Sequence, residues 1–228
     1  MRLHTTTVLS LGLVLALAGC SNNTSGPSNP TSSTAAAHAE DHNTPAATPL
    51  SSAALAKRLL NETDLGEGYT RKPDTVQQHD DVTVIGCPAL AELGGQAATG
   101  GSLNFPHSAK VTFTYAASNG SEVSEELYSD TAPKLSTGVN RIFNAMTSCP
   151  AYQVSVGSTL IDMRTQQVSA PRLGDEQWSQ LLTYSAGGQR SVVKQTAIRS
   201  GTILVVVSGS PALVNAHLAA AVRTALAH

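Results

Sequence analysis

Hydrophobic and polar residues alternate in the middle of the chain, and this alternation predicts paired strands. Residues 110–116 place one set of apolar side chains on a single side of a strand: Val111, Phe113 and Tyr115. A second strand over residues 121–128 follows Asn119-Gly120, a dipeptide that is typical of tight hairpin turns. We therefore expect these two strands to form a β-hairpin.

From Thr131 onward the spacing of the apolar residues becomes helical. Thr131 is the expected N-cap, Pro133 suits the first turn, and the helix is expected to end at Cys149. Its apolar face consists of Leu135, Val139, Ile142, Phe143 and Met146. A last helix is predicted to begin at Pro211, with an apolar face of Leu213, Val214, Leu218, Ala221, Val222 and Leu226. Shorter helices are expected over residues 51–60 and from Pro88.

Between the two long helices lie five β-rich runs, separated by glycine and proline residues. Four of them predict an antiparallel meander: residues 152–156, 159–168, 176–185 and 190–199. The fifth, residues 202–207, is almost wholly apolar and β-branched, as expected of a central strand buried on both faces. Together the elements predict one α+β domain over residues 51–228, with helices flanking a single antiparallel sheet.

The residues ahead of this domain have a different composition. Residues 21–50 are rich in Ser, Thr, Asn, Pro and Ala, so we interpret residues 20–50 as a lipidated cysteine followed by a disordered tether. Residues 1–19 combine a basic start with an apolar run of about ten residues, whereas a membrane-spanning helix needs roughly 20. We expect residues 1–19 to be a cleaved signal peptide.

The expected signal peptide ends in Leu17-Ala18-Gly19, and Cys20 follows, a pattern that resembles the lipobox of bacterial lipoproteins. We expect lipidation of Cys20 by acyl chains such as palmitate. Two or more chains give durable attachment, so the domain would be anchored on the extracytoplasmic face of the cell membrane. The alternative is an ordinary secreted protein in which Cys20 stands near the cleavage point by chance.

Two further cysteines, Cys87 and Cys149, bear on the compartment as well. Exported domains fold in an oxidising setting, so this pair predicts one structural disulfide.

Charged residues make up only 13% of the chain, and the formal net charge is −2, which does not favour a nucleic-acid partner. Trp178 is the sole tryptophan and aromatics total 4%, which leaves little material for a stacking platform.

Motifs for catalysis or metal binding are weak. Ser191-Val192-Val193-Lys194 matches a Ser-x-x-Lys pattern, but in a strand its serine and lysine point to opposite faces. His38 and His42 flank Glu40 and Asp41, yet these residues lie in the expected tether. His79-Asp80-Asp81 could bind a cation but is read as a polar turn between short strands, and His217 as a packed or solvated side chain. We expect neither a metal site nor a cofactor.

One segment unites charge, an aromatic ring and a turn, and is therefore the candidate rim of a cleft. It holds Arg172, Asp175, Glu176 and Trp178 around the Leu173-Gly174 turn. The alternative is structural: Asp175 would cap a turn and Trp178 would pack into the core.

The order of landmarks along the domain carries a family resemblance. These landmarks are Leu59-Leu60, Asp64-Leu65-Gly66, Gly68-Tyr69, Cys87-Pro88, Cys149-Pro150 and Leu173-Gly174-Asp175-Glu176. The chain resembles stand-alone actinobacterial lipoproteins related to the extracellular sensor domain of PknH-type serine/threonine kinases. The resemblance implies a helix-flanked antiparallel sheet of the Mog1/PsbP type, a cleft, and a ligand-binding or sensing role without catalytic residues. The sensor domains of those kinases carry two disulfides, whereas this domain has cysteines for one, and the chain has no kinase domain.

Three functions stay open at this point. The first is a non-catalytic lipoprotein with a sensor-type domain that binds a small ligand or a cell-envelope protein. The second is a cell-envelope hydrolase or another enzyme without a recognisable motif, which a cleft with convergent titratable groups would favour. The third is a protein that docks onto a membrane complex through an exposed surface.

Overall fold

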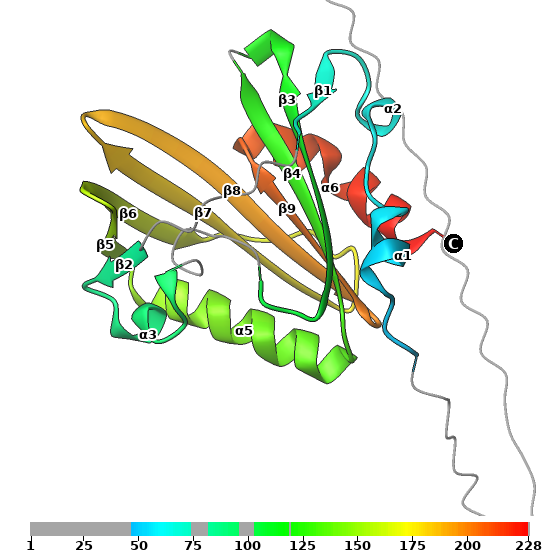
Figure 1. Ribbon diagram of the computed structural model, residues 1–228, viewed down its shortest axis with the longest axis horizontal. Coiled ribbons are helices and arrows are strands. Elements are labelled where there is room, and N and C mark those ends of the chain that lie inside the picture. Colours follow the sequence, from blue (N-terminus) through cyan, green and yellow to red (C-terminus); the bar gives the residue numbers. More distant parts are fainter. Residues whose placement is uncertain (1–46, 74–81, 96–102, 119, 228) are drawn as a thin grey trace, which may run out of the picture. The chain divides into compact units, whose positions relative to one another are not determined.

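A single antiparallel sheet dominates the computed structural model, which describes residues 47–73, 82–95, 103–118 and 120–227 (Figure 1). The strand order is β1-β3-β4-β9-β8-β7-β6-β5-β2. The strands are β1 Tyr69–Arg71, β2 Val82–Ile85, β3 His107–Tyr115, β4 Ser121–Ser129, β5 Ala151–Val156, β6 Thr159–Gln167, β7 Glu176–Ala186, β8 Gln189–Ser200 and β9 Ile203–Gly209. The helices are α1 Ser52–Ala56, α2 Glu62–Leu65, α3 Pro88–Ala91, α5 Ala132–Ser148 and α6 Pro211–Leu226. The predicted fold class is confirmed.

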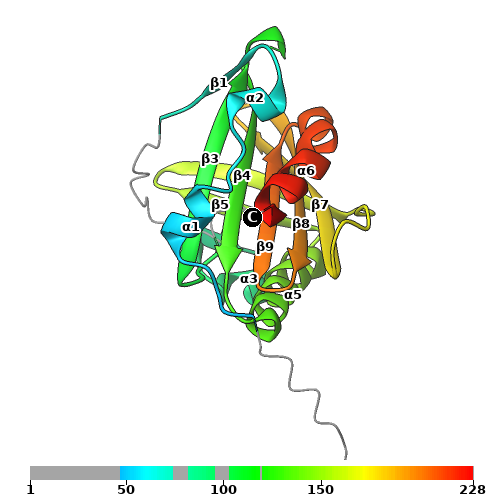
Figure 2. The same cartoon turned by 90° about the vertical axis from the view of Figure 1, so that its right-hand side faces the viewer.

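The central strand β9 shows how helices cover both faces of the sheet. Successive side chains of a strand point to opposite faces. Val205 and Val207 pack in one apolar cluster with α6, whereas Leu204 and Val206 pack in another with α5. The helices α5 and α6 therefore lie on opposite faces, as the two views show (Figures 1 and 2). The prediction of a central strand buried on both faces is confirmed.

The two faces take their names from these helices. The α6 face is covered by α6, α1 and α2, and its buried core includes Leu55, Leu60, Leu65, Val111, Phe113, Val123, Leu127, Val205, Val207, Leu218 and Ala221. The α5 face is covered by α5 and α3, with Tyr128, Leu135, Val139, Phe143, Met146, Tyr152, Val154, Met163 and Leu182 among its buried residues. No helix in the described ranges is long and apolar enough to cross a membrane.

The disulfide is on the α5 face and joins two helix ends. Cys87 is the residue before α3, and Cys149 directly follows α5. Their sulfurs are bonded, with the Cα atoms 5.7 Å apart. The predicted Cys87–Cys149 pair is confirmed, and it fastens α3 to the end of α5.

The long elements agree with the pattern of the sequence, and the short helix α3 begins at Pro88 as predicted, but other short elements differ from the prediction. The first helix was expected over residues 51–60 but ends at Ala56, because Asn61 begins a new helix through a capping box with Asp64. The hairpin of β3 and β4 is confirmed, although a 3₁₀ turn over Ala116–Ser118 precedes its tip. Short strands were expected on either side of residues 79–81, without bounds, and the structure has β1 before these residues and β2 after them.

Several predicted features lie outside the described residues. They are the signal peptide, Cys20, the tether with His38 and His42, Asn119, and His79-Asp80-Asp81.

Candidate functional site

The segment predicted to rim a cleft is tied to a buried arginine that the sequence analysis did not single out. The register of β7 and β8 places Glu176 opposite Arg199. Arg199 is 8% exposed, and its Nε donates to Glu176 Oε2 at 3.0 Å. Its Nη1 donates to Asp175 Oδ2 at 3.0 Å and to the carbonyl of Gly201 at 3.1 Å. One guanidinium thus holds both acids.

Further hydrogen bonds show that this cluster ties three elements together. Asp175 Oδ2 accepts from the backbone N–H of Gly201 at 2.8 Å, so this carboxylate caps the turn between β8 and β9. The hydroxyl of Ser136, on α5, donates to Glu176. Hydrogen bonds from Arg199 and Ser136 lower the pKa of Glu176. Both acids are therefore engaged in holding the fold.

Trp178 and Arg172 differ in how they are placed. Trp178 lies half-buried on the α5 face, where its indole N–H donates to Asn140 Oδ1 at 2.8 Å and its ring centroid lies 6.3 Å from that of Phe143. Arg172 is exposed, with no hydrogen bond or ion pair in the described part of the chain. The structure brings Asp175 and Glu176 together on Arg199 and leaves Arg172 apart. A role for the four residues as a cleft rim stays a prediction.

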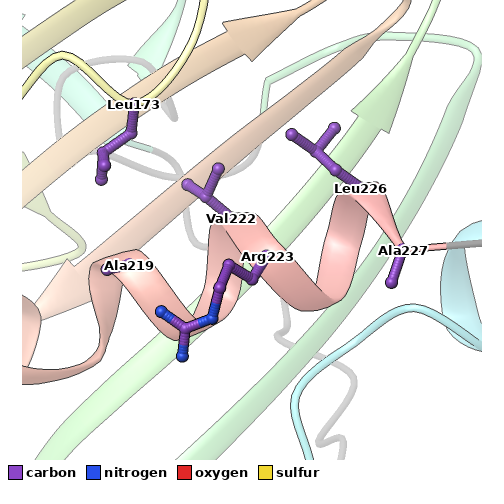
Figure 3. A pocket seen from close by; sticks show the side chains of 6 residues that line it. All are labelled: Leu173, Ala219, Val222, Arg223, Leu226 and Ala227. Atoms are coloured by element: carbon purple, nitrogen blue, oxygen red, sulfur yellow. The ribbon is translucent and has the colours of Figure 1, made fainter.

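The neighbouring residue, Leu173, lines an open hollow of about 790 Å³ beside the last helix (Figure 3). The other lining residues are Ala219, Val222, Arg223, Leu226 and Ala227. Figure 3 shows Leu173 reaching from its loop toward the helix and Val222 pointing from the helix toward the loop. Asp175, Glu176, Trp178 and Arg172 do not line it, although Leu173 belongs to the same turn as the predicted residues.

The hollow is chemically simple. Its lining is mostly apolar, and among the described residues that line it Arg223 is the one charged side chain. Arg223 is exposed, and its side chain makes no ion pair within the described ranges. Ligand sites combine apolar walls with a few polar groups that fix orientation. The hollow therefore suits an apolar group, with Arg223 available for an acidic one.

A second polar cluster lies on the α5 face of β3 and β4. Lys110 is opposite Glu126 in the strand register, and Lys110 Nζ lies 2.6 Å from Glu126 Oε1. The hydroxyl of Tyr128 donates to the other oxygen of Glu126, and the backbone N–H of Leu103 donates to that hydroxyl at 2.8 Å. The carboxylate has partners on both oxygens, and the cluster positions the segment that leads into β3.

Glu125, the preceding residue, points to the α6 face and is 1% exposed. Its Oε2 accepts from the backbone N–H of Leu60 at 2.6 Å, while its Oε1 has no hydrogen-bond partner in the described part of the chain. Burial raises the pKa of Glu125 to about 8; the Leu60 hydrogen bond opposes this and Asp64 adds to it. Alternation along β4 places Glu125 between Val123 and Leu127, a signal for burial that the sequence contained.

The remaining candidates are structural or absent from the described ranges. His217 Nε2 lies 2.6 Å from the hydroxyl of Tyr69, and burial lowers the pKa of His217. Ser191 and Lys194 point to opposite faces of β8, as expected, and Lys194 donates to Asn215 on α6. The described residues contain no group of three or more His, Cys, Asp or Glu side chains placed to hold a metal ion.

Comparisons with known proteins identify the fold. No family model matches the chain. No curated protein matches it either. Among solved structures, it is similar to the extracellular domain of PknH from Mycobacterium tuberculosis, with a TM-score of 0.58 and 14% sequence identity over 78% of this chain and 97% of that one. The resemblance to the PknH extracellular domain is thereby confirmed for the fold.

Proposed function

We propose that the chain is a membrane-anchored extracytoplasmic lipoprotein whose domain binds a ligand or partner without catalysing a reaction. The observation that carries the proposal is the fold, which covers 97% of an extracellular domain. The disulfide agrees with an oxidising compartment outside the cytoplasm. The lipobox at Cys20 supplies the anchor in this proposal.

The binding site in this proposal is the hollow between Leu173 and α6. Its volume is about 790 Å³ and it is open to solvent, so an occupant would contact it on one side only. Val222 and Leu226 offer apolar contact, and Arg223 can pair with an acidic group. A largely apolar ligand, or a partner segment with an acidic group, would fit this chemistry.

Native mass spectrometry on the mature chain, purified from an actinobacterial host, tests ligand binding. The expected result is a non-covalent adduct that is lost on denaturation. In Leu173→Asp the adduct should be lost, because a carboxylate would stand in the apolar wall. Leu160→Asp is the matched control, since Leu160 is a 50% exposed leucine on β6 outside the hollow. An adduct that persists in Leu173→Asp would exclude the hollow, and no adduct in any preparation would count against ligand carriage.

Membrane fractionation tests the anchor separately. The wild-type protein should sediment with membranes, whereas Cys20→Ala should be released or remain as an unprocessed precursor. A processed Cys20→Ala protein that still sediments with membranes would contradict lipidation at Cys20.

A further inference from the structure

The N-terminal strap, residues 50–65, crosses the α6 face and comprises α1, α2 and the turn between them. It is fixed at its start by the backbone N–H of Leu50, which donates to Ser129 Oγ at 2.8 Å. Three leucines anchor it in the core of the α6 face: Leu55, Leu60 and Leu65. The strap is thus a short segment held mainly by apolar side chains.

A single buried polar contact joins the middle of this strap to the sheet. The N–H of Leu60 donates to Glu125 Oε2, and the strand neighbours of Glu125 are Val111 on β3 and Val207 on β9. Both valines are fully buried. The second carboxylate oxygen, Oε1, is buried without a hydrogen-bond partner within the described ranges. A negative charge at this position would have only one stabilising contact.

Among the residues that the structure describes, no cation forms an ion pair with Glu125. The α6 residues packed in this core are apolar: Leu213, Val214, Leu218, Ala221, Val222 and Ala225. The titratable residues of α6 lie elsewhere, since His217 bonds to Tyr69 and Arg223 is exposed. From the strap, Asp64 acts on Glu125 as a like charge, and Arg58 donates to the carbonyl of Ala225 at 3.1 Å instead. Lys57 and Glu62 are exposed. An ionised carboxylate that is buried without a cation is strongly destabilised, whereas a neutral carboxyl is tolerated.

We propose that Glu125 is a protonation-controlled latch, which holds the N-terminal strap on the sheet while its carboxyl is neutral and releases the strap when the carboxyl ionises. Release lets the charged group reach water, which the closed strap prevents. Burial raises the pKa of Glu125 to about 8, so both states of the latch fall within the neutral pH range. The latch does not depend on ligand binding in the hollow. The strap begins where the predicted tether ends, so the latch would make the joint between domain and anchor sensitive to pH.

Hydrogen exchange over residues 52–65, followed by mass spectrometry at pH 6 and pH 9, tests the latch in the chain from Ser21 onward. After correction for intrinsic exchange rates, the equilibrium constant for strap opening in the wild type should increase roughly tenfold to a hundredfold from pH 6 to pH 9. Glu125→Gln keeps an acceptor for Leu60 but cannot ionise, so its opening should change less than about twofold. Glu122→Gln, an exposed carboxylate on the same strand, should behave as the wild type.

A strap that opens equally at both pH values in the wild type would overturn the latch, and so would equal pH dependence in Glu125→Gln. If Glu125→Gln does not fold, the wild type alone decides the matter. Carbon NMR of its glutamate carboxyl groups should show one that titrates near the midpoint of strap opening. Titration of every carboxyl in the usual acidic range would overturn the proposal.

Discussion

Two adjacent glutamates on β4 show how differently the two faces of the sheet treat a buried acid. Glu126 on the α5 face has Lys110 on one oxygen and the hydroxyl of Tyr128 on the other. Glu125 on the α6 face has one backbone N–H and an oxygen without a partner in the described part of the chain. Both are at most 6% exposed, so burial alone does not distinguish them. The partners do.

The faces also differ in how their covering elements are fastened. On the α5 face a disulfide joins α3 to the end of α5. On the α6 face, α6 and the N-terminal strap are held by apolar packing and a few hydrogen bonds. Sensitivity to pH should therefore concentrate on the α6 face, and sensitivity to reducing agents on the α5 face.

The largest expected effect is the pH dependence of stability on the α6 face. The pKa of Glu125 is about 8 in the folded protein against an ordinary value of 4.5. Between these values the unfolded chain has lost a proton that the folded chain keeps, so stability falls as pH rises and levels off above about 8. The fall attributable to Glu125 is about 5 kcal/mol at most. Urea denaturation at pH 5, 7 and 9 measures it, and a slope in Glu125→Gln as steep as in the wild type would contradict it.

Loss of the disulfide is expected to have the next largest effect. The bond closes a loop with a sequence separation of 62, for which the chain-entropy relation gives about 4 kcal/mol. The double variant Cys87→Ser, Cys149→Ser should lose approximately that much stability in denaturant titrations. The pH dependence from Glu125 should persist in it. If the double variant were as stable as the oxidised wild type, the disulfide would not be what fastens the covering elements of the α5 face.

Replacing each of the two glutamates with leucine should change the stability of the protein in opposite directions. Glu126→Leu removes the partner of Lys110 and Tyr128 and should lower stability by about 2 kcal/mol, because hydrogen bonds to charged groups are lost. Glu125→Leu removes a poorly partnered acid from an apolar core and should raise stability at pH 8. Thermal unfolding of both variants at that pH checks the signs. A shift in the same direction for both would show that local partners do not decide the effect.

An exposed ion pair between Glu122 of β4 and Lys72, which follows β1, should matter least. Lys72 Nζ lies 2.6 Å from Glu122 Oε1, and both side chains are 46% exposed. Lys72→Ala should change stability by less than about 0.5 kcal/mol, because solvent screens the pair. Denaturant titration at low salt is the sensitive measurement. A loss above 1 kcal/mol would mean that the pair is coupled to a larger network.

The longer elements were predictable because each shows its own periodicity. Helices α5 and α6 and strands β3 to β9 have enough residues for alternation or helical spacing to emerge. Strands β1 and β2 have three and four residues, and their extended backbone depends on pairing with β3 and β5. The helix α2 depends on one capping box. Such short pieces carry too little pattern to be recognised alone.

The candidate site was less predictable because its geometry depends on strand register. Asp175 and Glu176 were singled out, but their shared partner, Arg199, lies across the β7–β8 pair. A register counted outward from the two-residue Gly187-Gly188 turn would have placed Arg199 opposite Glu176. The hollow beside Leu173 depends on how a loop sits against α6, and no local pattern encodes that arrangement.

The two ends of the sheet order have a consequence for solubility at a crowded surface. The outermost strands, β1 and β2, are only three and four residues long. A free strand edge is a template for adding another chain, and its strength grows with the number of unpaired backbone groups in a row. The outermost strands are therefore too short to recruit a neighbour readily, and beyond β1 the edge of β3 is partly occupied, since Lys72 N–H donates to the carbonyl of Thr112 and Ser108 N–H donates to Ser52 Oγ. Many copies of the domain could then stand side by side without joining into a continuous sheet.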